Sequence, residues 1–369
     1  MILKFDFITM GSKNKKHLIC YLTRGILLLS QLILLDSCSC KDDSDTTLRP
    51  PEADTQYLVT YITQSSAIVS SGVITWGLYT NVSFEYGTTL SYGDSMPCPE
   101  FSGNHPSPPA LLVDNTLTRL APGSTYHFRL IASNKYGTDY GDDSFFTTLN
   151  KGQNGINFNT ELNYGTLSDI DGNIYKTIQV GSQTWMAENL KTIRLNDATP
   201  ITNVTSAYNW IRLTTPAYCW YSNDSASYKP SNGALYNWYA VNTNKLCPNG
   251  WHIPTKEEWT ALFDNLGGKD LAAGKIQEKG TNHWQSQGSD VSNSSGFTAL
   301  PCGYRNDGLT DGVFGELGRG ASWYSSTFDT SFSRSFAVSL FITVYSGPRL
   351  VVDYANYSTQ GKSVRCIKD

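Results

Sequence analysis

The chain has 369 residues, a formal net charge of −4 at pH 7 and only 16% charged residues, and it is rich in aromatic side chains, with 22 Tyr and 9 Trp. The mild charge and the lack of a basic block in the sequence exclude a typical nucleic-acid-binding protein, so no nucleic-acid partner is expected. This balance is typical of an extracellular, β-rich protein and not of a cytosolic enzyme. The length suits two domains of ordinary size, each able to bury a core.

Residues 1–37 have the organisation of a secretory signal peptide. Lys13, Lys15 and Lys16 precede an uninterrupted apolar core of 11 residues, 25–35, which is too short to span a bilayer as a helix. A small residue then precedes Cys38, and this arrangement resembles the lipobox of bacterial lipoproteins. The resemblance implies cleavage before Cys38 and lipidation of its thiol. Because Asp36 departs from the lipobox pattern, Cys40 is the alternative lipidation site.

Residues 38–54 are polar and acidic, with too few apolar side chains to pack, so we expect a disordered tether. Acidic residues directly after a lipidated Cys also resemble the surface-export signal of Bacteroidetes lipoproteins, and the two interpretations are compatible. Together they predict an outer-membrane lipoprotein at the cell surface. One lipidated N-terminal Cys carries enough acyl chains for stable anchoring, so the membrane would be a partner through lipid alone.

Residues 55–148 alternate short β-rich runs with turns rich in Gly, Asn and Pro, which predicts an all-β sandwich. We expect strands over residues 57–62, 67–74, 81–86, 111–117, 125–133 and 144–148. The segment LAPGSTYHFRLIASNKYG (120–137) resembles a strand and its corner in fibronectin type III domains. The resemblance implies that the Tyr126 hydroxyl bonds the backbone near Leu120. Such a domain either binds ligands through its loops or serves as a spacer, and residues 149–164 then read as a polar linker.

The last part of the chain, residues 165–369, begins with a turn signal. The pair Asp171-Gly172 lies between two β-rich runs, which predicts a hairpin because Gly accepts positive φ. The alternative is a calcium loop with Asp169, Asp171 and Asn173 as ligands. That alternative lacks the Gly and the distal Glu at the spacing a calcium loop requires, so the turn is favoured.

A capping box at Thr255 and Glu258 starts the most clearly predicted helix. Its apolar face has the helical spacing i, i+3, i+4 and i+7 and consists of Trp259, Leu262, Phe263 and Leu266. Gly267-Gly268 ends it. Further helices are expected over residues 234–241 and 270–279. Strands are expected over residues 297–300, 323–326, 334–341, 349–353 and 363–367, so the pattern alone indicates an α+β module.

Six short motifs occur in fixed order in this part of the chain. They are DIDGNIYK (169–176), WMAENL (185–190), CPNGWHIP (247–254), EW (258–259), LPCGYR (300–305) and SVRC (363–366). Together they resemble the Fibrobacter succinogenes major paralogous domain, a module of bacterial surface and secreted proteins. The resemblance covers about 200 residues and implies a C-type lectin-like fold, related to that of formylglycine-generating enzymes. It implies almost no chemistry, because the family has no established general activity.

Two of these motifs contain Cys247 and Cys366, and the resemblance implies a disulfide between them in an oxidising compartment. Cys219 and Cys302 are candidates for a second pair. Related sequences more often carry Gly at the position of Cys302, so this chain departs from the pattern there.

No catalytic constellation is recognisable in the sequence, and no cofactor or metal is expected. The five histidines, at positions 17, 105, 127, 252 and 283, are isolated, and no pair has metal-ligand spacing. Formylglycine-generating enzymes use closely spaced cysteines near the C-terminus, where this chain has only Cys366. An enzyme is therefore not expected, and an uncharacterised hydrolase is the third-ranked alternative.

Eight of the nine tryptophans lie after residue 184. Because Trp is the largest apolar side chain, Trp185, Trp251 and Trp259 are expected in the core. Sugar-binding surfaces combine aromatic faces with amides and carboxylates. The candidate ligand-binding residues are Trp220, Tyr221, Asp224, Arg305, Asn306, Asp307, Trp323 and Tyr324. The sequence thus predicts a lipid-anchored surface protein that binds a glycan or protein ligand, or else a structural or adhesive component without a small ligand.

Overall fold

The computed structural model describes residues 48–99, 103–104, 110–286, 288–306, 314–329, 336–343, 349–355 and 359–369. Residues 48–369 form one compact unit. The predicted signal peptide, both candidate lipidation cysteines, most of the predicted tether and Asp307 lie outside the described residues. Within these ranges, no helix is both long and apolar enough to cross a membrane.

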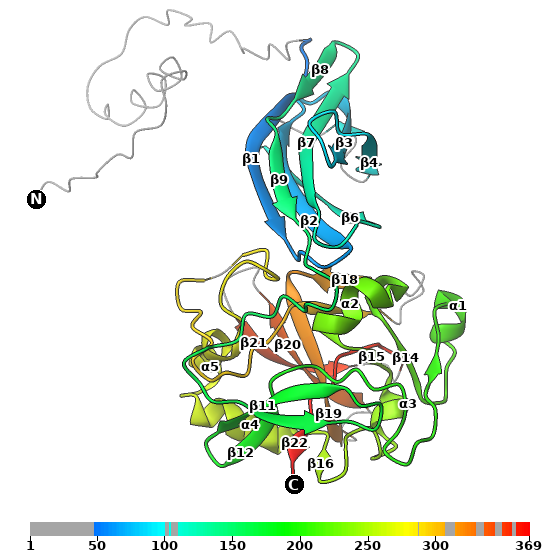
Figure 1. Ribbon diagram of the computed structural model, residues 1–369, viewed down its shortest axis with the longest axis vertical. Coiled ribbons are helices and arrows are strands. Elements are labelled where there is room, and N and C mark those ends of the chain that lie inside the picture. The colour runs from blue at the N-terminus through cyan, green and yellow to red at the C-terminus, as the bar shows by residue number, and fades with distance from the viewer. Residues whose placement is uncertain are drawn as a thin grey trace, which may run out of the picture. The chain divides into compact units, whose positions relative to one another are not determined.

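The N-terminal part is a β-sandwich of two antiparallel sheets (Figure 1). One sheet has the order β1-β2-β6, formed by Glu52–Thr60, Ser66–Ile74 and Leu111–Thr118. The other has the order β4-β3-β7-β8, with β5 beside β3 and β9 beside β7. Its strands are β3 Tyr79–Gly87, β4 Asp94–Pro97, β5 Gly103–Asn104, β7 Thr125–Asn134, β8 Gly137–Tyr140 and β9 Ser144–Thr147. All six expected strands are present, and β4, β5 and β8 are additional.

Strand β7 shows why this region folds as a sandwich. Its residues Tyr126, Phe128, Leu130 and Ala132 are buried in alternation with half-buried ones, because successive side chains of a strand point to opposite faces. The Tyr126 hydroxyl accepts a hydrogen bond from the N–H of Ala121 at 2.9 Å, which confirms the expected corner next to Leu120. The region is therefore a fibronectin type III-like sandwich.

The C-terminal part contains three further sheets among the described residues (Figure 1). The first has the order β10-β11-β12-β22-β16, formed by Gly165–Ser168, Ile174–Val180, Gln183–Met186, Ile367–Lys368 and Trp251–His252. The second is β13-β14-β15, formed by Thr202–Asn203, Ala217–Cys219 and Leu235–Tyr236. The third is β18-β17-β19-β20-β21, formed by Phe314–Leu317, Cys302–Arg305, Gly320–Asp329, Phe336–Thr343 and Arg349–Ala355.

Short helices connect these strands. They are α1 Ala207–Trp210, α2 Ser225–Asn232, α3 Trp238–Val241, α4 Lys256–Asn265, α5 Lys269–Ile276 and a 3-10 turn, η2, over Tyr221–Asn223. Helix α4 starts with the predicted capping box, in which Thr255 and Glu258 bond each other's backbone N–H. The helix expected over 234–241 begins only at Trp238. Asn237 caps it by accepting from the N–H of Ala240, and Leu235–Tyr236 before it pair as a strand.

The loop at residues 169–173 is a hairpin turn, as the sequence favours. The Asp169 carboxylate accepts from the N–H groups of Asp171 and Asn173, both at 2.9 Å, and from the hydroxyl of Tyr175 at 2.5 Å. The Asp171 carboxylate binds Arg194 at 2.5 Å. Protein donors therefore occupy the carboxylates that a calcium loop would present, and they hold the turn closed.

The predicted disulfide between Cys247 and Cys366 is present, with 6.0 Å between the Cα atoms and 119 residues between the two positions. The suggested second pair is wrong, because Cys219 and Cys302 are both free and buried. Each has other neighbours: Cys219 interacts with Arg305, whereas the Cys302 sulfur lies 3.2 Å from Nδ2 of Asn189.

Candidate functional site

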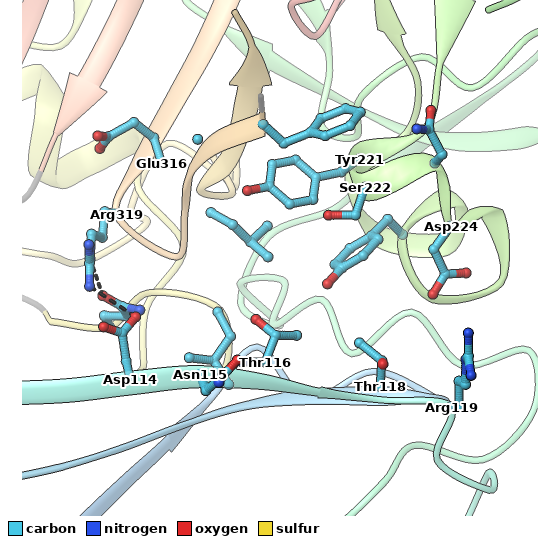
Figure 2. Close-up of a pocket in the computed structure, with 17 residues that line it drawn as sticks. Asp114, Asn115, Thr116, Thr118, Arg119, Tyr221, Ser222, Asp224, Glu316 and Arg319 are labelled. Carbon is cyan, nitrogen blue, oxygen red and sulfur yellow. Dashed lines mark hydrogen bonds and ion pairs between the residues drawn. The ribbon is translucent and has the colours of Figure 1, made fainter. Parts of the chain in front are cut away.

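A cleft of about 780 Å³ opens between the sandwich and the C-terminal module (Figure 2). One wall is the outer face of β6. Because Val113 and Leu117 point into the sandwich core, the alternate residues Asp114, Thr116 and Thr118 point outward into the cleft. This wall therefore presents a carboxylate and two hydroxyls in a row along one strand.

The opposite wall comes from the C-terminal module. The 3-10 turn contributes Tyr221 and Ser222, and Asp224 follows as the N-cap of α2. Strand β18 and the turn after it add Glu316 and Arg319. In Figure 2 these side chains face the β6 residues across the cleft. The site is thus built from segments about 100 residues apart in sequence.

Backbone strain is concentrated along this cleft. Arg119, Ser222, Asn223 and Glu316 all have φ between 49° and 63°, although none is glycine. Such conformations cost on the order of 1–3 kcal/mol each and persist only where the surroundings hold them. The Asn223 amide, for example, donates to the carbonyl of Thr205 at 3.2 Å. The strained turns fix the positions of the lining side chains.

The polar groups of the cleft are partly satisfied and partly accessible. Arg319 binds the Asp114 carboxylate at 3.0 Å, and its Nε donates to Gln285 at 2.6 Å. The half-buried Asp224 carboxylate accepts from the N–H groups of Ala226 and Ser227, as expected of an N-cap. These bonds fix the orientation of the side chains that line the cleft.

The two tyrosines of the cleft are neutral at physiological pH. Burial raises the pKa of Tyr228 to about 12, and burial likewise raises the pKa of Tyr221 above its ordinary value. The rings lie 5.2 Å apart in a T-shaped contact, and Tyr221 also packs on Phe314. The cleft therefore combines an aromatic floor with hydroxyl, amide and carboxylate groups.

Tyr61, at the end of β1, anchors the sandwich in the C-terminal module. Its N–H donates to the carbonyl of Asn282 at 2.6 Å, and its hydroxyl donates to Oδ1 of Asn232 at 2.5 Å. Its ring contacts His283 edge-on, with 5.0 Å between the ring centres. The side chain is 1% exposed, so this contact is part of the protein interior.

Two further bonds beside Tyr61 join the same segments. Ser65 and Ser227 share a hydroxyl–hydroxyl hydrogen bond at 2.7 Å, and the amide of Gln64 donates to the carbonyl of Ala226 at 2.5 Å. Ala226 and Ser227 both lie in the first turn of α2, next to the Asp224 cap. The anchor thus fixes the same turn and helix start that line the cleft.

The segment 149–164, expected as a polar linker, makes specific contacts. The N–H of Leu149 donates to the carbonyl of Thr63, and Phe158, Leu162 and Tyr164 pack on the core cluster around Trp185. Polar composition alone did not reveal these anchoring aromatic and aliphatic positions.

Of the predicted ligand-binding residues, Tyr221 and Asp224 line the cleft. The prediction is wrong for Trp220, Trp323 and Tyr324, whose side chains are buried in the core and do not form a solvent-facing surface. The Trp323 indole N–H donates to Oδ1 of Asn189 at 2.9 Å. These rings carry large apolar areas, and the module uses them for packing.

Arg305 is also a structural residue and not a ligand-binding one. Its guanidinium is buried, donates to the carbonyls of Val204 and Thr205 at 2.7 and 2.9 Å, and lies over the ring of Trp210. Asn306 is half-buried and is not among the residues that line the cleft.

The sequence prediction missed the wall contributed by the sandwich. The outward polar residues of β6 follow the strand's alternation, but nothing in the sequence indicates that this face meets the C-terminal module. As expected, Trp185 and Trp259 are buried and Trp251 packs partly buried against the core. Within the described ranges, no group of three His, Cys, Asp or Glu side chains is close enough to hold a metal ion.

The model of the Fibrobacter succinogenes major domain matches residues 178–368, just over half of the 369-residue chain. The chain belongs to this family. No curated protein matches the sequence. The matched range contains the disulfide, helix α4 and the buried Arg365.

Several solved structures are similar to part of the chain. The sensor domain of the anti-sigma factor RsgI4 in Pseudobacteroides cellulosolvens is 22% identical, with 28% of this chain and 99% of that chain covered and a TM-score of 0.23. The chicken CNTN1 FN1–FN3 domains are 17% identical, with coverage of 27% and 32% and a TM-score of 0.22. A fibronectin type III domain derived from human KIAA0970 protein is 16% identical, with coverage of 31% and 87% and a TM-score of 0.20. At these scores, the sandwich is assigned from its own strand order and tyrosine corner.

Proposed function

We propose that this chain is a non-catalytic, lipid-anchored protein of the cell surface that binds a glycan, with a C-terminal module of the C-type lectin-like class. The observation that carries the proposal is the cleft between β6 and the 3-10 turn, with its aromatic floor and polar rim. Ligand sites are typically concave and combine apolar walls with a few fixed polar groups.

A glycan suits this chemistry better than an apolar or highly charged ligand. Sugar hydroxyls both donate and accept hydrogen bonds, and the cleft offers partners of both kinds. Thr116, Thr118 and Ser222 can do either, while the Asp224 carboxylate only accepts. The neutral rings of Tyr221 and Phe314 supply an apolar surface for the C–H faces of a sugar ring.

The first test is a glycan array probed with residues 48–369, which form one compact unit. Asp224→Asn keeps a helix-capping oxygen but removes the charge, and Thr116→Trp fills the cleft from the β6 side. Both variants are expected to weaken binding at least about tenfold, a loss of about 1.4 kcal/mol. Thr138→Trp, on exposed β8, is the matched control and should bind as the wild type does.

A folded, monodisperse sample that binds no glycan would overturn the proposal. Binding that both cleft variants leave unchanged would place the ligand elsewhere and remove the cleft from the site. Adding a chelator separates a direct mechanism, which is insensitive to it, from calcium-dependent binding.

The anchoring part of the proposal rests on the sequence of the N-terminal segment. Full-length chain is expected in the outer-membrane fraction, and Cys38→Ser should release it from that fraction. Cys40→Ser tests the alternative lipidation site, and Cys98→Ser, in the sandwich, is the control. Release by neither N-terminal substitution would contradict lipid anchoring.

A further inference from the structure

A second hollow, of about 650 Å³, continues from the cleft along the outer face of the sandwich. The two hollows share Gln285 and Arg319 as lining residues. Their boundary is the ion pair between Arg319 and Asp114, at 3.0 Å. The second hollow, here called the trough, has a lining that includes Asp54, Leu58, Ser70, Gly72, Ala110 and Leu112.

The trough differs from the cleft in chemistry. Leu58 and Leu112 project from the β1-β2-β6 sheet with 39% and 63% of their surface exposed. They lie across the central strand from one another, since Leu58 is opposite Ser70 and Leu112 is opposite Gly72. These two leucines make this part of the sheet apolar, whereas most outward positions of such a sheet are polar.

Gly72 forms the floor of the trough. A Cβ atom there would lie 3.5 Å from the Cβ of Ala110 and 3.0 Å from the Asp54 carboxylate. These close neighbours make the trough a narrow channel at Gly72, between the side chains of Asp54 and Ala110. A third hollow of about 310 Å³ shares Asp54, Gly72 and Ala110 and extends the channel further.

The polar cleft and the apolar trough lie end to end along one strand. Leu112 and Thr118 are six residues apart on β6, which corresponds to roughly 20 Å. Asp114, at the boundary, is two residues from Leu112 on the same face. One elongated ligand can therefore contact both hollows at once.

We propose that the cleft and the trough together bind one amphiphilic glycoconjugate, with its sugar in the cleft and a hydrocarbon aglycone in the trough. The inference rests on the proposed function, because it assigns the sugar to the same cleft. The narrow floor at Gly72 suits an unbranched hydrocarbon chain, and the flanking leucines supply its apolar contacts. A ligand without an apolar part would leave these leucines in water.

The probes are matched glycosides of each sugar in a small panel, once as the methyl and once as the n-octyl glycoside, used below the micelle-forming concentration. Calorimetry with residues 48–369 measures both affinities. Each methylene that leaves water adds about fourfold in affinity, so burial of only part of the octyl chain predicts at least about tenfold tighter binding than the methyl glycoside.

Two kinds of variant test whether the octyl group binds in the trough. Leu58→Asn with Leu112→Asn makes the trough polar at exposed positions, and Gly72→Ala narrows its floor by one Cβ atom, for which the end of the Asp54 side chain has to move. Both are expected to bring the octyl affinity to within about twofold of the methyl affinity, without changing the methyl affinity. Leu90→Asn is the matched control, since Leu90 is 67% exposed on the sandwich outside the trough. Thermal unfolding checks that each variant is folded.

Equal affinity for the methyl and octyl glycosides would overturn the inference while leaving the glycan site intact. Tighter binding of the octyl than of the methyl glycoside that persists in both trough variants would also overturn the inference, because the octyl group would then bind elsewhere. If neither glycoside of any sugar binds, the inference and the proposed function fail together. An octyl advantage that only the trough variants abolish supports the inference.

Discussion

The sandwich and the C-terminal module bury their cores by different means. In the sandwich, one cluster of apolar side chains comes from alternate positions of long strands, such as Val69, Phe84 and Phe128. In the C-terminal module, fully buried polar groups lie among the tryptophans. Arg365 is 0% exposed, and its guanidinium donates to Asn189 at 2.8 Å and to the carbonyls of Phe297 and Thr298.

This difference shows what each region requires of its sequence. A sandwich core needs only apolar residues at period two, and volume-conserving exchanges are tolerated there. A core with a buried charge needs each partner in place, because an unpaired buried group costs its full desolvation energy. The C-terminal module should therefore be the more sensitive of the two to single substitutions.

The largest expected effect comes from removing the disulfide. The double variant Cys247→Ser, Cys366→Ser opens a link between positions 119 residues apart. It should lower the free energy of unfolding of the C-terminal module by about 4–5 kcal/mol in the chain-entropy description. Urea unfolding followed by Trp fluorescence reports on this module, because eight of nine tryptophans lie in it. A loss below about 1 kcal/mol would contradict the expectation, and Cys98→Ala in the sandwich is the control.

Arg365→Met should have the second-largest effect and lower the free energy of unfolding by about 3 kcal/mol. Met fills much of the volume but leaves the carbonyls of Phe297 and Thr298 without their donor. The comparison is Arg129→Met on the sandwich, where the partly exposed pair with Glu85 contributes at most about 1 kcal/mol. Equal losses for the two variants in urea unfolding would remove the proposed distinction between the regions.

Tyr126→Phe tests the sandwich at its tyrosine corner. The change removes the acceptor for the N–H of Ala121 and should cost about 1 kcal/mol. Tyr79→Phe, at a phenol that is 62% exposed, should leave stability unchanged. Far-ultraviolet circular dichroism during thermal unfolding measures both, and an unaffected Tyr126→Phe variant would show that the corner is dispensable.

The smallest effect is a pH dependence at His252. Burial alone would lower its pKa, but hydrogen bonds with Asp369 at 2.6 Å and Glu258 at 2.9 Å raise it above its ordinary value. Its contribution to stability is therefore fully present below the unfolded-state pKa near 6.5 and is lost as the pH rises through the folded-state pKa. His252→Gln should cost at most about 1 kcal/mol at about pH 5.5 and almost nothing at about pH 9. The same loss at both pH values would contradict this assignment.

The features that sequence predicted are those governed by local patterns. Alternation along β7 and the capping box at Thr255 act within a few residues, and both are present as expected. The disulfide at Cys247 came from the family motifs. Burial of Trp323 and the strand at Leu235–Tyr236 depend on partners far along the chain, so local patterns misassigned them. Of the residues that line the cleft, the sequence indicated only Tyr221 and Asp224 of the C-terminal module. It did not indicate the β6 wall, which belongs to the sandwich.

The anchoring of Tyr61 limits how this protein can be recombined. Multidomain proteins often exchange whole modules, and a sandwich that acts only as a spacer can be replaced freely. Here Tyr61 fills a buried position of the C-terminal module, and β6 supplies one wall of the cleft. A chimera carrying another sandwich would leave that position empty and the cleft one-sided. The two modules therefore fold against each other as a pair, and replacing the first would change the shape of the cleft that it forms with the second.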